Sequence, residues 1–130
     1  MTDAELRTMS ELVSFLPAFR DYDSKFLPGT VGACVEILEQ EYGLDEAMTV
    51  IRASVPTPLR ETAYMIACEV AVADGPPRPE ELRLLELLRD TLELDTLVTA
   101  AIERGTRARY ASLPETQDPE TQDTAALFET

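Results

Sequence analysis

The sequence predicts an all-α protein, a single-domain helical bundle of about six helices. Apolar residues recur at intervals of three and four along most of the chain, which is the period of an amphipathic helix. No segment shows the sustained apolar-polar alternation, rich in Val, Ile and Thr, that is typical of strands. The length of 130 residues suits one domain with one hydrophobic core.

The first helix is expected to begin at Thr2 and to stop at Leu16. Thr2 and Glu5 have the spacing of a capping box, and Pro17 disfavours helical geometry at the residue before it. One apolar stripe follows from the spacing, and its members are Leu6, Met9, Leu12, Val13 and Leu16.

The second and third helices are predicted on either side of Gly43. The polar residues 21–24 offer caps for a second helix that runs to about Tyr42, and Gly43 is a natural C-terminal stop. A short third helix is expected from Leu44 to about Ser54.

The fourth helix, predicted from about Pro58 to Ala73, is the most apolar of the set. Its expected buried face consists of Leu59, Ala63, Ile66, Ala67, Val70 and Ala71. The small residues Ala63, Ala67 and Ala71 lie four apart and let a neighbouring helix approach closely. We therefore expect this helix to be central.

Two further helices complete the bundle. The fifth is expected from Glu80 to about Glu93, with a stripe made of Leu82, Leu85, Leu88 and Leu92. Asp95 can cap a sixth helix that ends near Arg109. From residue 111 the composition changes, and P-E-T-Q-D occurs twice in residues 114–123. We therefore predict a helical domain over residues 1–110 and an acidic, disordered tail over residues 111–130.

The charge balance restricts the partners. The chain has 25 acidic and 11 basic residues, a formal net charge of −14, and no histidine. This excess of negative charge argues against nucleic acid and against anionic membrane surfaces. No apolar run approaches the roughly 20 residues that cross a bilayer, so no membrane insertion is expected. With no visible signal peptide and only two cysteines, a cytoplasmic location is predicted.

Few residues indicate a chemical site. Without histidine, none of the serines can form a Ser-His triad, and no glycine-rich phosphate motif is present. Cys34 and Cys68 are interpreted as small core residues. Glu69 shares a helix face with Glu61 and Met65, and we expect that face to be solvated. A cluster of acids can attract a basic partner or simply form a hydrated helix face: Glu36, Glu39, Glu41, Asp45 and Glu46.

Residues 63–75, A-Y-M-I-A-C-E-V-A-V-A-D-G, form an alanine-rich helix that ends in Asp74-Gly75, and Glu81 follows seven positions after Asp74. In these residues the chain resembles the tellurite-resistance TerB-like family. The resemblance extends from the first helix to Arg109 and implies an all-helical bundle of two helix-loop-helix halves. Residues 5–7 and 81–83, both E-L-R, start the matching helices of this pseudo-repeat. The chain lacks the family's first acidic loop.

The resemblance implies a noncatalytic, bacterial, cytoplasmic protein that acts in the tellurite or metal stress response. It also implies a divalent-cation site for Ca²⁺ or Mg²⁺, with Asp74 and Glu81 as ligands and Asp3 and Glu5 as candidate helpers. The same residues fit an ordinary capped turn, because Asp-Gly is common turn chemistry and acids are favourable at a helix N-terminus. The alternative hypothesis is an acidic scaffold or regulatory module that binds a protein partner without metal. The sequence leaves the oligomeric state open.

Overall fold

A computed structural model of the chain describes residues 2–114. All regular secondary structure in this range is helical, and it comprises six α-helices and three short 3-10 turns, which lie between α1 and α2 and between α3 and α4. The α-helices are α1 (Asp3–Phe15), α2 (Leu27–Leu38), α3 (Gly43–Ser54), α4 (Arg60–Ala71), α5 (Pro79–Thr91) and α6 (Thr96–Arg109). The predicted all-α bundle of about six helices is confirmed. The predicted tail lies outside the described residues from position 115 onward.

Local capping chemistry fixes the start of α1. The Thr2 hydroxyl accepts a hydrogen bond from the Glu5 N–H at 3.2 Å, and Glu5 Oε2 accepts one from the Thr2 N–H at 3.0 Å. The helix ends just before Leu16 and Pro17, as expected. Leu12 and Val13 of the predicted stripe are buried, and its other members are half-buried.

The connection between α2 and α3 differs from the prediction. Helix α2 ends at Leu38, not near Tyr42, and Gly43 begins α3 instead of stopping the preceding helix. Tyr42 makes the turn with a left-handed φ of 61°. Gly43 then lies so close to α2 that a Cβ at this position would overlap the carbonyl oxygen of Ile37. Glycine is required here by close approach, which a periodicity argument cannot see.

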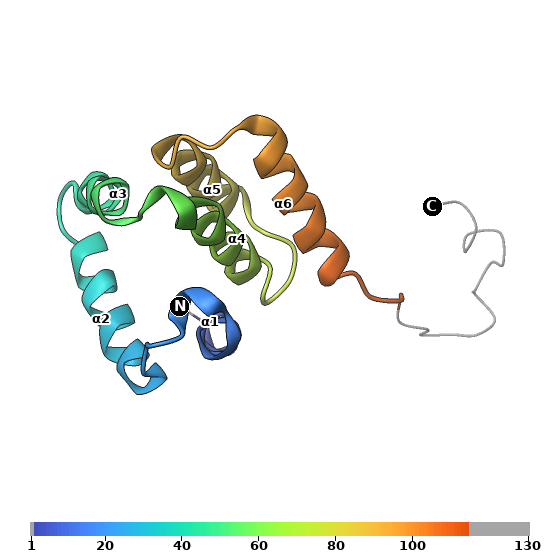
Figure 1. Cartoon of the computed structure of the whole chain (residues 1–130), viewed down its shortest axis with the longest axis horizontal. Helices are drawn as coiled ribbons and strands as arrows, with labels where there is room; N and C mark the ends of the chain where they lie inside the picture. Colours follow the sequence, from blue (N-terminus) through green and yellow to red (C-terminus); the bar gives the residue numbers. More distant parts are fainter. Residues whose placement is uncertain (1, 115–130) are drawn as a thin grey trace, which may run out of the picture.

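Helix α4 is central, as predicted, and packs against α1, α5 and α6 (Figure 1). Tyr64 and Cys68 form the core of this region together with Leu92 at the end of α5, and Leu85, Leu88 and Ile102 pack around them. The fully buried residues of α4 are Tyr64, Cys68, Glu69 and Ala71. Of the predicted buried face, Ala71 is buried, Ala63, Ile66, Ala67 and Val70 are half-buried, and Leu59 is exposed. The row of Ala63, Ala67 and Ala71 is only one part of the surface of α4 that α1, α5 and α6 cover.

Arg60 ties the ends of the neighbouring helices together. Its guanidinium donates to the carbonyl oxygens of Leu92 at 3.2 Å and Arg52 at 3.4 Å, which belong to the ends of α5 and α3. Arg52 also pairs with Glu93 at 2.6 Å. These contacts hold α3 against α5 and thereby position the α2–α3 pair relative to α4.

Helix α2 lies at the margin of the bundle. It packs chiefly on α3 and on the 3-10 turn Ser24–Phe26 (Figure 1). Leu27 is its single buried residue. The rest of this apolar helix is half-buried or exposed.

Candidate functional site

One face of α2 carries apolar side chains that the bundle covers only in part. Leu27, Val31, Cys34 and Leu38 recur at spacings of four, three and four and therefore lie on one face of the helix. We call these four residues the α2 seam. Exposure rises along it: Leu27 is 6% exposed, Val31 is half-buried, Cys34 is exposed and Leu38 is 50% exposed. The seam is thus covered at its N-terminal end and open at its C-terminal end.

More exposed apolar side chains adjoin the seam on the α2–α3 pair. Val35 follows Cys34, Tyr42 makes the turn into α3, and Val50 lies on α3 itself. Isolated exposed apolar residues are common on protein surfaces, but a continuous apolar patch marks an interaction site. We define the α2–α3 surface as the seam with Val35, Tyr42 and Val50, which brings several exposed apolar side chains to one helix pair.

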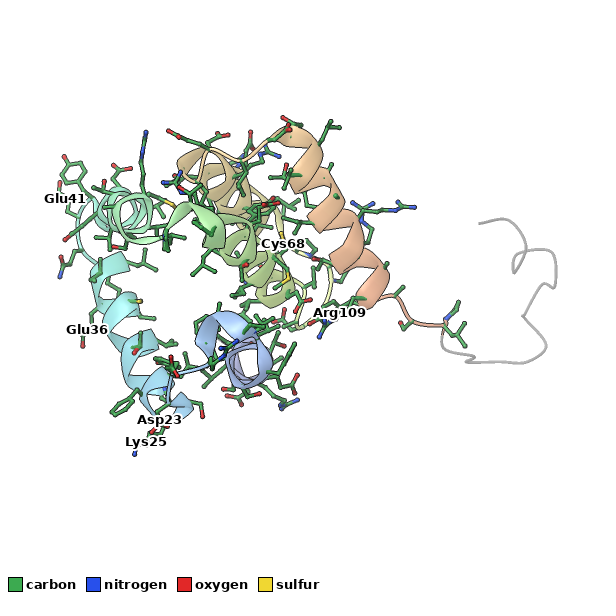
Figure 2. All side chains as sticks on the ribbon, viewed as in Figure 1. Asp23, Lys25, Glu36, Glu41, Cys68 and Arg109 are labelled. Carbon is green, nitrogen blue, oxygen red and sulfur yellow. The ribbon has the colours of Figure 1, made fainter. Side chains whose placement is uncertain are left out.

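Acidic residues are gathered on the same helix pair. All five members of the predicted acidic cluster are exposed, and none of them forms an ion pair within residues 2–114. Figure 2 shows Glu36 and Glu41 on the outer side of α2 and of its junction with α3, away from α4. Residues 26–51 contain no lysine or arginine. Residues 26–51 therefore carry only negative charge, and Glu36, two positions from both Cys34 and Leu38, lies on the face of α2 opposite the seam.

The residues predicted to bind a divalent cation are spread over two places. Asp74 is exposed in the loop after α4, and Glu81 lies in the first turn of α5. Gly75 has a φ of 131°, so the loop turns where the sequence indicates. Asp3 and Glu5 lie in the first turn of α1, where Glu5 is engaged in the capping box.

A basic side chain occupies the space beside Glu81. The Arg78 Nε donates to Glu81 Oε1 at 2.8 Å. This hydrogen bond and the charge of Glu81, with smaller effects of Glu80 and Asp74, raise the pKa of Arg78. Residues 2–114 contain no group of three or more His, Cys, Asp or Glu side chains arranged to hold a metal ion. The cation site stays a prediction.

The two cysteines lie in different environments. Cys68 is buried, as predicted, and this burial raises the pKa of its thiol to about 11. Cys34 is exposed, so its assignment to the core was wrong. The reason is that α2 lies at the margin of the bundle and packs chiefly on α3 and on a 3-10 turn.

Glu69 was predicted to be solvated, and this is wrong: it is 3% exposed. Its Oε1 lies 3.3 Å from the Arg109 Nε at the end of α6, and its Oε2 has no hydrogen-bond partner among the described residues. Arg109 also lies over the Phe15 ring, 6.0 Å from its centroid. Helical spacing assigned Glu69 to a wet face because it treats α4 as one-sided, whereas α1 and α6 both pack on this helix.

A second polar contact crosses the same α4–α6 interface. The fully buried Tyr64 donates its hydroxyl to Glu103 Oε1 at 3.2 Å. Burial is the main cause that raises the pKa of Tyr64 above its ordinary value. The sequence assigns neither residue a role: Tyr64 lies in the 63–75 stretch without belonging to the predicted apolar face, and Glu103 belongs to no motif. Their pairing joins two helices, and the Cys68 thiol adjoins the Tyr64 hydroxyl.

An open hollow lies between the end of α1 and the start of α2. It has a volume of about 580 Å³ and is lined by residues from Val13 to Ser24, including Phe15, Phe19, Arg20 and Asp23. The lining combines aromatic rings with one basic and one acidic side chain. No described helix is both long enough and apolar enough to cross a membrane.

No family model matches this chain, and no curated protein or solved structure is significantly similar to it. The similarity to TerB-like proteins seen in residues 63–81 therefore remains an expectation from the sequence.

Proposed function

We propose that this chain is a noncatalytic, acidic protein-interaction domain of the bacterial cytoplasm, and that its α2–α3 surface binds another protein. The observation that carries the proposal is the position of α2. Its sequence, L-P-G-T-V-G-A-C-V-E-I-L, contains a single charged residue, yet only Leu27 is buried. A helix of this composition is expected to be covered on at least one face, and a partner would supply the cover.

The chemistry of the side chains supports a noncatalytic role. The chain has no histidine to act as a general base near neutral pH. The thiol of Cys68 is enclosed in the core, and its raised pKa keeps it protonated and unreactive near pH 7. Tyr64 and Glu103, the closest approach to an acid-base pair, contact each other inside the α4–α6 interface.

Variants of the surface test the proposal. The double substitution Val35→Ser/Leu38→Ser removes apolar area without changing charge, at positions 39% and 50% exposed. Leu97→Ser/Leu113→Ser is the matched control, because both leucines are exposed and lie in and beyond α6. A specific partner captured from the native host should be retained by wild type and by the control, and lost by the α2 variant. Capture that is equal in all three proteins contradicts the proposal.

A second candidate function is the divalent-cation role in tellurite or metal stress that the family resemblance implies. One observation favours it: the loop that turns at Gly75, with a φ of 131°, joins the exposed Asp74 to Glu81 in the first turn of α5. A cation would compete with the Arg78 guanidinium for Glu81. Calorimetry with Ca²⁺ and Mg²⁺, described below, tests this role separately from partner binding.

A further inference from the structure

We infer that the acidic C-terminal segment of the chain, residues 115–130, lies back against the outer face of α6 and closes that face to other ligands. The contact is intramolecular. It does not depend on the proposed function, because α6 packs on α4 and not on the α2–α3 pair. The inference follows from the exposure of this face, its charge, and the composition and reach of the segment.

The outer face of α6 is not covered within residues 2–114. Helix α6 packs chiefly on α4, and Figure 1 shows it at the outer edge of the bundle. Thr99 and Thr106 point into the bundle and are buried. The opposite side of the helix carries exposed residues at spacings of four, three and four, which we call the α6 outer face: Leu97, Ala101, Arg104 and Ala108. Leu97 is 79% exposed, so the apolar part of this face is open to a ligand.

The α6 outer face is positively charged. Arg104 lies on it and Arg107 lies beside it, three positions further along the helix. Both arginines are exposed, and neither forms an ion pair within residues 2–114. The acid of this helix, Glu103, accepts a hydrogen bond from the buried Tyr64 and therefore points towards α4. The face combines an apolar contact with unneutralised positive charge.

Residues 115–130 have the complementary composition. They contain no basic residue and five acids: Glu115, Asp118, Glu120, Asp123 and Glu129. An apolar run, A-A-L-F, follows the acids of the repeat at residues 125–128. A segment with so few apolar residues cannot form a core of its own, but it can order against a surface that offers opposite charge and an apolar contact.

The segment is long enough to reach the far end of α6. Leu97 lies about 18 Å from Arg109, because each helical residue adds about 1.5 Å. A flexible chain of about 18 residues, the separation of Arg109 and Leu127, has a root-mean-square span of about 23 Å. Leu127 can therefore meet Leu97 without stretching the chain. At such lengths the effective concentration is of the order of millimolar, so a contact with a dissociation constant of about 1 mM is occupied in about half of the molecules.

Charge favours this face over the α2–α3 surface. Residues 26–51 contain acids and no base, so an acidic segment meets no opposite charge there. The net charge of the whole chain, −14, opposes the contact at long range. At physiological ionic strength, however, exposed charges are screened beyond about 8 Å, and the nearby arginines decide the interaction.

A spin label at residue 124 tests the contact in the full chain by NMR. Thr124→Cys is combined with Cys34→Ser, and the buried Cys68 leaves one accessible thiol for the label. The amide signals of the α6 outer face should lose more than about half of their intensity, because the contact is occupied in about half of the molecules. A segment that does not dock would broaden Ala108 far more than Leu97, since Ala108 is nearer the point where the segment begins. Docking should broaden both equally, and a loss that decays from Ala108 to Leu97 overturns the inference.

Charge reversal on α6 tests the electrostatic part. Arg104→Glu/Arg107→Glu in the labelled protein should restore most of the intensity at Leu97. Arg7→Glu/Arg83→Glu is the matched control, because it changes the net charge equally at two exposed arginines of α1 and α5 that form no ion pair within residues 2–114. The control should keep the intensity loss. Equal recovery in both variants would mean that overall charge decides, and the inference would be overturned.

The apolar part is tested outside the helical bundle, where folding is not at stake. Leu127→Ser/Phe128→Ser should also restore most of the intensity at Leu97, and raised salt should restore part of it. Circular dichroism of each variant verifies that the helices are intact. An unchanged intensity loss in the Leu127→Ser/Phe128→Ser variant removes the apolar anchor and overturns the inference.

Two further measurements distinguish other occupants. Spin-labelled protein at natural isotope abundance is mixed with unlabelled nitrogen-15 protein, and a loss of signal at Leu97 in this mixture would assign the face to the segment of a second copy. A loss on α2 and α3 instead of α6 in the labelled protein would place the segment on the α2–α3 surface. Either result overturns the inference. Neither decides the proposed function, which fails only when partner capture does not depend on Val35 and Leu38.

Discussion

Helices α2 and α4 have opposite relations between composition and burial. Helix α4 carries Glu61 and Glu69 and buries one of them, together with Tyr64 and Cys68. Helix α2 carries one acid and buries only Leu27. The difference arises because α1, α5 and α6 pack on α4, whereas α2 packs chiefly on α3 and a 3-10 turn. Burial in this protein is decided by the number of neighbouring helices, and an apolar sequence that lacks neighbours points to a partner.

The largest expected effect compares one leucine from each region. Leu92→Ala removes a side chain that is 1% exposed beneath α4, and it should lower the free energy of unfolding by about 3 kcal/mol. Leu38→Ala, at 50% exposure on α2, should lower it by less than about 1 kcal/mol. Urea denaturation measures both. Similar losses would mean that α2 is packed as tightly as α4, and would contradict the difference in burial between the two helices.

Arg109 tests the buried charge in the α4 region. Arg109→Ala leaves the Glu69 carboxylate without its ion-pair partner, and we expect a loss of about 2 kcal/mol. The value lies below that of a fully buried pair because the Arg109 side chain is 55% exposed, which lets water reach the site.

Two variants serve as controls for Arg109. Arg107→Ala, at an exposed arginine of the same helical turn, should change stability by less than about 0.5 kcal/mol. Adding Glu69→Gln to Arg109→Ala should recover part of the loss, because the uncompensated charge is then absent. If Arg109→Ala were as stable as wild type, the ion pair would be structurally neutral.

The two cysteines sharpen the comparison through pH. The pKa of Cys68 is raised to about 11 in the folded protein, whereas an unfolded cysteine ionises at about 8.5 to 9. Between these values the unfolded state releases the proton first, so stability is fully present below about pH 8 and falls as pH rises towards 11. The loss should be of the order of 2 kcal/mol.

Cysteine variants isolate that effect. Cys68→Ala should remove this part of the alkaline slope, and Cys34→Ala, at the exposed thiol of α2, should leave it in place. Urea denaturation at a series of pH values between 7 and 10 is the measurement. Because the raised pKa of Tyr64 adds a similar loss at higher pH, the comparison is made below pH 10. Identical slopes in the two variants would contradict the assignment to Cys68.

The smallest expected effect concerns the carboxylates at the α4–α5 loop. Ca²⁺ or Mg²⁺ should bind weakly, at or beyond the weak end of the calcium range of about 10⁻⁴ to 10⁻³ M, because few carboxylates offset dehydration of the ion. Asp74→Asn and Glu81→Gln should reduce the calorimetric heat further. Arg78→Gln should increase it, because its guanidinium occupies Glu81. Equal heats in all four proteins would leave a capped turn as the explanation.

Sequence reasoning succeeded where the decisive interactions are local. The capping box of Thr2 and Glu5 and the Asp95 cap of α6 both form between residues two or three positions apart. It failed where a distant segment decides. Gly43 is required by the Ile37 carbonyl, and Glu69 is buried by helices whose arrangement no spacing encodes.

The candidate site was predicted only in part for the same reason. The acidic cluster was visible in the sequence because charge is a property of the residues themselves. The exposure of Cys34 and Leu38 was not visible, because it depends on a neighbour that residues 2–114 do not provide. The seven-residue spacing of Asp74 and Glu81 is visible in the sequence. The hydrogen bond from Arg78 to Glu81 is not, because it depends on how the loop folds onto the start of α5.

The tight contact between Gly43 and Ile37 has a consequence for the affinity with which the α2–α3 surface binds a partner. Because the backbone of Gly43 lies directly against that of Ile37, we expect α2 and α3 to keep one relative orientation whether or not a partner is bound. A surface that is already in its bound shape loses little conformational entropy on association. The binding energy of a modest number of exposed side chains is then available for affinity and is not spent on ordering the receptor.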